Sequence, residues 1–99
     1  MSFQLRFTPE AANDLKRLYG FLAENNPKAA KKALKAIDKS WGILENFPFS
    51  CRKADDANPF LREILISFGN SGYVAVYEIE DNETVTVLAV RHQREEDYY

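Results

Sequence analysis

Cysteine and histidine are nearly absent from this 99-residue chain, in which Cys51 and His92 are the single examples of each. One cysteine cannot form an intrachain disulfide, and one of each residue is too few for a Cys/His zinc site. We therefore expect no metal and no cofactor. Cys51 follows the sequence Phe-Pro-Phe-Ser, which favours a small packed thiol over a nucleophile activated by His92.

Long apolar runs and targeting signals are also missing. The opening Met-Ser-Phe-Gln lacks the basic and apolar stretches of a signal peptide, and no run approaches the roughly 20 apolar residues of a transmembrane helix. The chain has no glycine-rich phosphate loop, no HExxH motif and no GxSxG motif. We expect a cytoplasmic protein with no membrane partner and without the signature of a common enzyme class.

Charge is distributed unevenly along the chain. The formal net charge is -2, but residues 1–53 sum to +5 and residues 54–99 sum to -7. A nucleic-acid-binding protein is more often basic throughout, so we expect no direct binding to nucleic acid. The basic half favours contact with an oppositely charged protein partner.

Two proline-marked signals predict a pair of helices. Thr8 is a suitable N-cap and Pro9 suits the first helical position, because the N–H group that proline lacks has no partner there. Asn26 and Pro27 repeat the signal, and a Phe-Pro-Phe sequence ends the second helix. The short link predicts an antiparallel helical hairpin over about 9–46.

The second predicted helix has a lysine-rich face. Its lysines lie opposite its apolar residues at helical spacing. They are Lys28, Lys31, Lys32, Lys35 and Lys39. This face is either a solvated helix surface or a surface that meets phosphate or an acidic protein segment.

The remaining pattern predicts strands. Alternating or continuous apolar residues indicate strands over 3–7, 61–68, 73–79 and 84–90. Residues 50–59 carry turn formers without periodicity and are predicted to form a loop, and the last three strands form a meander over about 61–92. The order β-α-α-β-β-β predicts an α+β fold, a single domain over 1–99 with the hairpin packed on one face of a curved antiparallel sheet.

The last strand runs into a polar segment that contains the best candidates for a site. Period-two alternation places Val85, Val87 and Ala89 on one side of this strand and Val90 on the other. Cations, the histidine and a tyrosine then follow, with another arginine at the start of an earlier strand. The candidate residues are Arg62, Arg91, His92, Arg94 and Tyr98. They either contact a phosphate or another target, or form salt bridges with Glu95, Glu96 and Asp97.

Several short motifs, in this order, resemble the RelE/ParE toxin superfamily over nearly the whole chain. They are Phe-Thr-Pro-Glu-Ala at the first helix, Phe-Pro after the second, Leu61-Arg62, Tyr73-Val74-Ala75-Val76-Tyr77, and Val-Arg-His-Gln-Arg-Glu from Val90 onward. The resemblance implies the toxin of a bacterial type II toxin–antitoxin module, of the kind linked to plasmid stabilisation. It further implies a cognate antitoxin that wraps around the toxin as a hetero-oligomer, with the helical hairpin and exposed parts of the sheet as its binding surface.

The superfamily contains two modes of action. RelE-like members cut mRNA on the ribosome with basic residues and often a tyrosine, whereas ParE-like members lack that set and inhibit DNA gyrase. RelE-like chains commonly have a basic residue after the tyrosine of the third strand, where this chain has Val74. A valine cannot move a proton or stabilise a phosphorane, and an acidic second half suits ribosomal RNA poorly. Both differences favour a ParE-like, non-catalytic gyrase inhibitor.

Under this interpretation Arg91, His92, Arg94 and Tyr98 contact the target, with Arg62 nearby. The alternative is a RelE-like ribosome-dependent mRNA endoribonuclease in which His92, Tyr98 and Arg91 are catalytic. A second alternative is a non-toxic family member that only binds its antitoxin.

Overall fold

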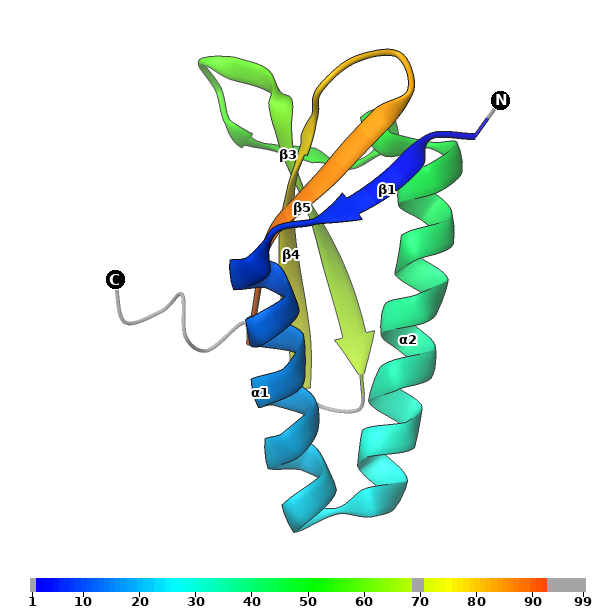
Figure 1. Cartoon of the computed structure of the whole chain (residues 1–99), viewed down its shortest axis with the longest axis vertical. Coiled ribbons are helices and arrows are strands. Elements are labelled where there is room, and N and C mark those ends of the chain that lie inside the picture. Colours follow the sequence, from blue (N-terminus) through cyan, green and yellow to red (C-terminus); the bar gives the residue numbers. More distant parts are fainter. Residues whose placement is uncertain (1, 69–70, 93–99) are drawn as a thin grey trace.

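In the computed structural model, which describes residues 2–68 and 71–92, helices α1 and α2 pack on one face of a five-stranded sheet (Figure 1). This arrangement confirms the predicted α+β fold. The elements are β1 (Gln4–Phe7), α1 (Pro9–Asn25), α2 (Pro27–Asn46), the 3-10 helix η1 (Pro48–Ser50), β2 (Arg52–Asp55), β3 (Asn58–Phe68), β4 (Ser71–Ile79) and β5 (Thr84–His92).

The helical hairpin begins and turns where the sequence predicts. The Thr8 hydroxyl oxygen accepts a hydrogen bond from the Ala11 N–H at 3.1 Å, which caps α1. Asn26 caps α2 in the same way through Ala29 at 3.1 Å, while its own N–H donates to the carbonyl of Leu22 at the end of α1. One residue therefore ends one helix and begins the next. In the described chain, no helix combines the length and apolar content that crossing a membrane requires.

The strand order is β1-β5-β4-β3-β2, and the prediction of an antiparallel sheet is wrong for β1. This strand pairs in parallel with β5, from Gln4 beside Thr84 to Phe7 beside Val87, whereas the other neighbours are antiparallel. Alternation of apolar residues indicates which face of a strand is buried, but it contains no information on the direction of the neighbouring strand.

The predicted loop over 50–59 is also wrong, because it contains β2 and the start of β3. All four residues of β2 are exposed, so the strand has no apolar alternation to reveal it. Its pairing with β3 places Arg52 opposite Glu63, and their side chains form an ion pair. An edge strand of this kind forms through backbone pairing and charge, which periodicity does not detect.

A β-bulge in β5 changes which residues face the helices. Val76 pairs with Ala89, but Tyr77 pairs with Val87, so Leu88 is an extra residue on β5. Val87 and Val90 consequently both face the helices, and each is 0% exposed in the core. The predicted placement of Val90 on the opposite side from Val87 is therefore wrong.

Tyr77 joins the centre of the sheet to the segment after α2. Its ring is fully buried, and its hydroxyl donates a hydrogen bond to the carbonyl oxygen of Pro48 at 2.6 Å. Burial, followed by the neighbouring Cys51, raises the pKa of the Tyr77 hydroxyl far above its usual value. The phenol is therefore a neutral donor that fixes η1 against β4.

Replacing Tyr77 with Phe tests this contact. Tyr77→Phe leaves the Pro48 carbonyl without its donor, so the free energy of unfolding should fall by about 1–2 kcal/mol in urea denaturation at pH 7. Tyr19→Phe is the control, since Tyr19 is 43% exposed and its substitution should change stability by less than about 0.5 kcal/mol. Equal losses in the two variants would contradict the assignment.

The raised pKa values of two buried tyrosines predict a loss of stability at alkaline pH. The pKa values of Tyr73 and Tyr77 are raised in the folded state by burial, so the unfolded chain loses these protons first. Their contribution is fully present below about pH 10, the ordinary tyrosine value, and falls as the pH rises above it. Urea denaturation between pH 8 and 11 should show a steeper decline for the wild type than for Tyr77→Phe. Parallel curves would show that Tyr77 does not contribute.

Candidate functional site

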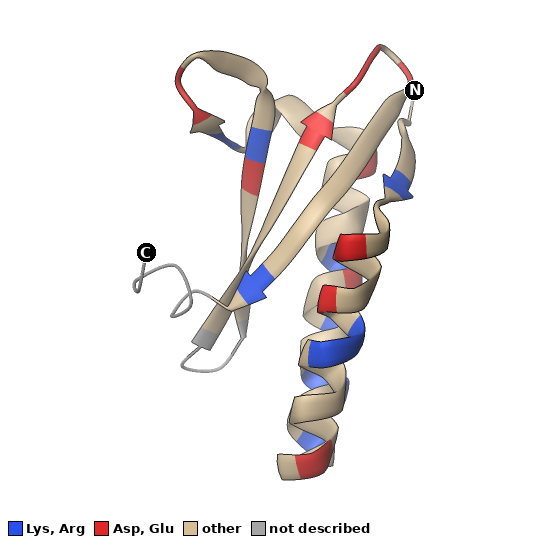
Figure 2. Ribbon diagram, turned by 60° about the vertical axis from the view of Figure 1, so that its left-hand side comes forward, with Lys and Arg blue, Asp and Glu red and all other residues tan. Residues whose placement is uncertain are grey.

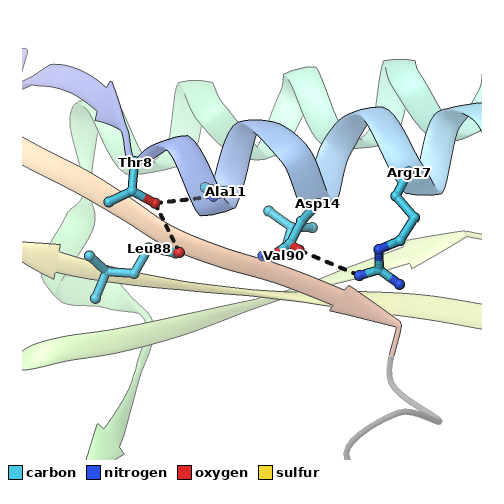
Figure 3. Close-up of polar contacts among 6 residues, drawn as sticks. All are labelled: Thr8, Ala11, Asp14, Arg17, Leu88 and Val90. Carbon is cyan, nitrogen blue, oxygen red and sulfur yellow. Dashed lines mark hydrogen bonds and ion pairs between the residues drawn. The ribbon is translucent and has the colours of Figure 1, made fainter.

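The candidate site lies at the end of β5, where one edge of the strand is covered by α1 instead of by another strand. In the described chain, β1 pairs with β5 only from Thr84 to Val87 and ends at Phe7. The next residues of β5 lie along the first half of α1 (Figure 3). The backbone groups at this edge therefore need partners from the helix.

Two side chains of α1 and its cap supply those partners. The Thr8 hydroxyl donates a hydrogen bond to the carbonyl of Leu88 at 3.0 Å while it caps the helix (Figure 3). Asp14 accepts a hydrogen bond from the N–H of Val90 at 3.0 Å, and its other oxygen lies 3.4 Å from the guanidinium of Arg17. These contacts satisfy a polar group of the bulged residue Leu88 and one of Val90, two residues later, and they hold the end of β5 against α1.

His92 lies on the face of the sheet that carries the helices. Its ring contacts Tyr73 edge-to-face, with centroids 5.5 Å apart and an interplanar angle of 85°. Tyr73 is only 2% exposed, and burial raises the pKa of its hydroxyl. Tyr73 therefore packs against the half-buried His92 and is poorly placed to exchange a proton with a bound RNA.

Arg91 lies on the opposite, outer face. Neighbouring residues of a strand point to opposite faces, and Arg91 is exposed beside Val74, which in turn pairs with Leu65 on β3. The adjacent outer-face row is Glu63, Val76 and Ala89. Arg91 and His92 therefore do not converge on one group, and the neighbours of Arg91 on β4 and β3 in its own row are apolar.

Arg62 is separated from both residues, so the expectation that it lies nearby is wrong. It pairs with Tyr77, whereas His92 pairs with Tyr73, four residues and about 13 Å away along β4 at a rise of about 3.3 Å per residue. Its guanidinium donates hydrogen bonds to backbone carbonyls at 2.7–3.3 Å, and these belong to Pro59, Phe49 and Cys51. Arg62 thus holds the β2–β3 hairpin against η1.

Arg94 and Tyr98 lie outside the described residues, and their roles stay predictions. The sequence analysis missed the contribution of Asp14. The position of Asp14 within α1 is the signal that could have revealed it. Asp14 falls three residues after Ala11 and four before Leu18, both of which are buried. A carboxylate on the buried side of a helix needs a partner, and here that partner is a backbone N–H. In the described residues, no group of three or more His, Cys, Asp and Glu side chains is arranged to hold a metal.

Comparison with known proteins matches residues 5–97 to the family model for the ParE toxin of the type II toxin–antitoxin system parDE. The chain belongs to the ParE toxin family. Membership confirms the resemblance to the RelE/ParE superfamily and implies an antitoxin partner for this toxin.

Relatives of this ParE-family toxin include members with RelE names. Toxin RelE3 of Caulobacter vibrioides is 30% identical over 88 residues, which cover 88% of this chain and 90% of that protein. Toxin RelE1 of the same organism is 32% identical over 79 residues, which cover 80% of this chain and 82% of that protein. A chain of the chromosomal ParDE toxin–antitoxin system from P. aeruginosa has the same fold, with a TM-score of 0.69, 18% identity, and coverage of 91% of this chain and 95% of that chain.

Replacing Asp14 with Ala tests the link between α1 and β5. Asp14→Ala leaves the N–H of Val90 without its acceptor, so stability should fall by about 1–3 kcal/mol and hydrogen exchange at the Val90 amide should accelerate. Asn13→Ala, at the exposed neighbouring position, should leave that amide protected. If both variants exchange at the wild-type rate, Asp14 does not hold the strand.

Proposed function

We propose that this toxin arrests growth by inhibiting DNA gyrase, that it acts by binding without chemistry of its own, and that a cognate antitoxin neutralises it. The observation that carries the proposal is the placement of Arg91 and His92 on opposite faces of the sheet. General acid/base cleavage of RNA needs a proton-transfer group and a cation within hydrogen-bonding distance of the same phosphate. Adjacent residues of a regular strand do not meet that requirement.

The environment of each residue gives further support. Arg91 lies beside Val74, whose next neighbour in the same row is Leu65, and these hydrocarbon side chains supply neither protons nor hydrogen bonds. Tyr73, the tyrosine that contacts His92, is buried with a raised pKa. The exposed arginine at the end of a strand suits a contact with another protein, where arginine is enriched. We therefore assign target contact to Arg91, His92, Arg94 and Tyr98, and omit Arg62 because backbone carbonyls occupy its guanidinium.

The hairpin offers a surface for the antitoxin. A cavity of about 130 Å³ opens between α1 and α2, lined mainly by apolar side chains that include Leu15, Leu22, Ile37 and Trp41. Leu34, on its margin, is 39% exposed. An apolar side chain of the antitoxin entering this cavity would bury surface that the toxin alone leaves in water.

The ribonuclease alternative has one observation in its favour, which is the RelE name of the relatives from Caulobacter vibrioides. In that mechanism His92, Tyr98 and Arg91 would share the chemistry. A non-toxic chain that only binds its antitoxin is the remaining alternative.

A supercoiling assay beside a translation assay separates these functions. Purified toxin is added to gyrase, ATP and relaxed plasmid, and in parallel to a cell-free translation reaction. We expect loss of supercoiling or trapped cleaved plasmid, with translation intact. Stalled translation with cut mRNA and normal supercoiling would contradict the proposal in favour of the ribonuclease. Normal results in both reactions would indicate the non-toxic family member.

Substitutions add a quantitative test. The double variant His92→Ala, Tyr98→Phe should keep gyrase inhibition within about tenfold, because binding energy is shared among several contacts. A ribonuclease would lose about 10²- to 10⁴-fold with its acid and base. Arg91→Ala should weaken gyrase inhibition more than Arg6→Ala, which removes an exposed arginine from β1 at a distance from the site.

A further inference from the structure

An open groove of about 650 Å³ lies at the other end of the sheet from Arg91 and His92. We call it the aromatic–acidic groove. It is formed where β4 ends at Ile79 beside Val85, whereas His92 pairs with the beginning of β4. Its apolar lining is Phe3, Phe49, Phe60 and Ile79. The groove is therefore distinct from the candidate site and from the cavity between the helices.

The aromatic lining is held in place yet remains half in water. Phe49 and Phe60 are 51% and 50% exposed, and their rings meet edge-to-face with centroids 6.2 Å apart. The guanidinium carbon of Arg62 lies 5.4 Å from the centroid of the Phe49 ring, so this ring already makes a cation–π contact within the protein. A preorganised aromatic pair that the fold leaves exposed is typical of a surface that another molecule covers.

The other side of the groove is acidic. It is lined by Glu78, Glu80 and Asp81, and Figure 2 shows acidic residues gathered at this end of the sheet. Glu80 accepts a hydrogen bond from the Thr86 hydroxyl, and Asp81 accepts from backbone N–H groups that include that of Glu83. These backbone bonds lower the pKa of Asp81, so it stays charged at neutral pH. Among the described residues, no lysine or arginine lines the groove.

We propose that the aromatic–acidic groove binds an extended segment of a different protein, in which an arginine or lysine stands next to a bulky apolar residue. The apolar side chain would cover the faces of Phe49 and Phe60, and the cation would reach the carboxylates of Glu78 and Glu80 across the groove. The combination of an aromatic floor and an acidic side fits this chemistry, and it repels the phosphates of a nucleic acid. The proposal does not depend on whether gyrase is the target.

A second copy of the chain fits the groove less well. The lysine-rich surface of this protein lies along α2, on different elements from the groove. Contact between the groove of one copy and α2 of the next would be head-to-tail, so it would extend into a chain of molecules unless the rotation closed a ring. We therefore infer that the occupant of the groove is a segment of another protein.

The test measures binding of the full chain to a labelled Leu-Arg-Leu-Arg-Leu peptide by fluorescence polarisation. Matched peptides Leu-Glu-Leu-Glu-Leu and Ser-Arg-Ser-Arg-Ser remove the cation or the apolar side chains. We expect the first peptide to bind at least about tenfold more tightly than either control, since both components of the groove are then engaged. Backbone amide shifts in NMR spectra should change around Phe60 and Glu80.

Variants locate the binding. Phe60→Ala should weaken the peptide about tenfold, and Glu80→Gln, which can still accept from Thr86, should weaken it about threefold. The controls are Phe47→Ala and Glu24→Gln, which change an exposed Phe and an exposed Glu outside the groove and should leave affinity unchanged. Glu80→Gln keeps the test decisive if Phe60→Ala does not fold.

Three results would overturn the proposal. One is equal affinity for the arginine and glutamate peptides, and another is unchanged affinity in Phe60→Ala and Glu80→Gln. The third is concentration-dependent assembly of the wild type, in sedimentation, that Glu80→Gln abolishes; the occupant would then be a second copy. None of these results alters the supercoiling assay, so the two proposals fail separately.

Discussion

The contact between α1 and the end of β5 is the constraint on which the candidate site depends. β1 is too short to cover β5, and the bulge at Leu88 disturbs the ladder where that cover ends. Thr8 and Asp14 supply a donor and an acceptor at this point. Leaving either backbone group unpaired costs about 1–3 kcal/mol, a large share of the roughly 5–15 kcal/mol that stabilises a domain. The first helix, α1, thus positions the last strand of the sheet, β5.

Local chemistry made the helices predictable, and long-range pairing limited the rest. Thr8 and Asn26 each cap a helix by a hydrogen bond to a residue three positions later, so the hairpin expected over about 9–46 agrees with α1 and α2. β2 was missed because a fully exposed edge strand has no buried face to impose a period. The parallel direction of β1 depends on β5, whose paired residues lie 80 positions later in the chain (Gln4 with Thr84), and apolar alternation within the strand does not encode it.

The candidate site was predictable as a location but not as an arrangement. A buried strand ending in Arg91 and His92 is visible in the sequence, and both residues do lie at the end of β5. Grouping Arg62 with them assumed that cations gather at one edge, whereas register places Arg62 beside Tyr77 and its guanidinium against backbone carbonyls. The importance of Asp14 follows from the end of β1 at Phe7, which leaves the N–H of Val90 without a strand partner, and single-residue propensities do not encode this long-range pairing.

The bulge in β5 determines on which face of the sheet each later side chain of the strand lies. Because Leu88 is unpaired in the ladder, Val90 and His92 lie on the helix side and Arg91 lies outside. If the same sequence paired without the bulge, each of those side chains would change face, since the period of a strand is two, whereas deleting Leu88 itself would restore a regular strand and leave the faces unchanged. A change in the pairing of this one residue would thus redirect the chemistry of the strand end, with no side chain of the site replaced.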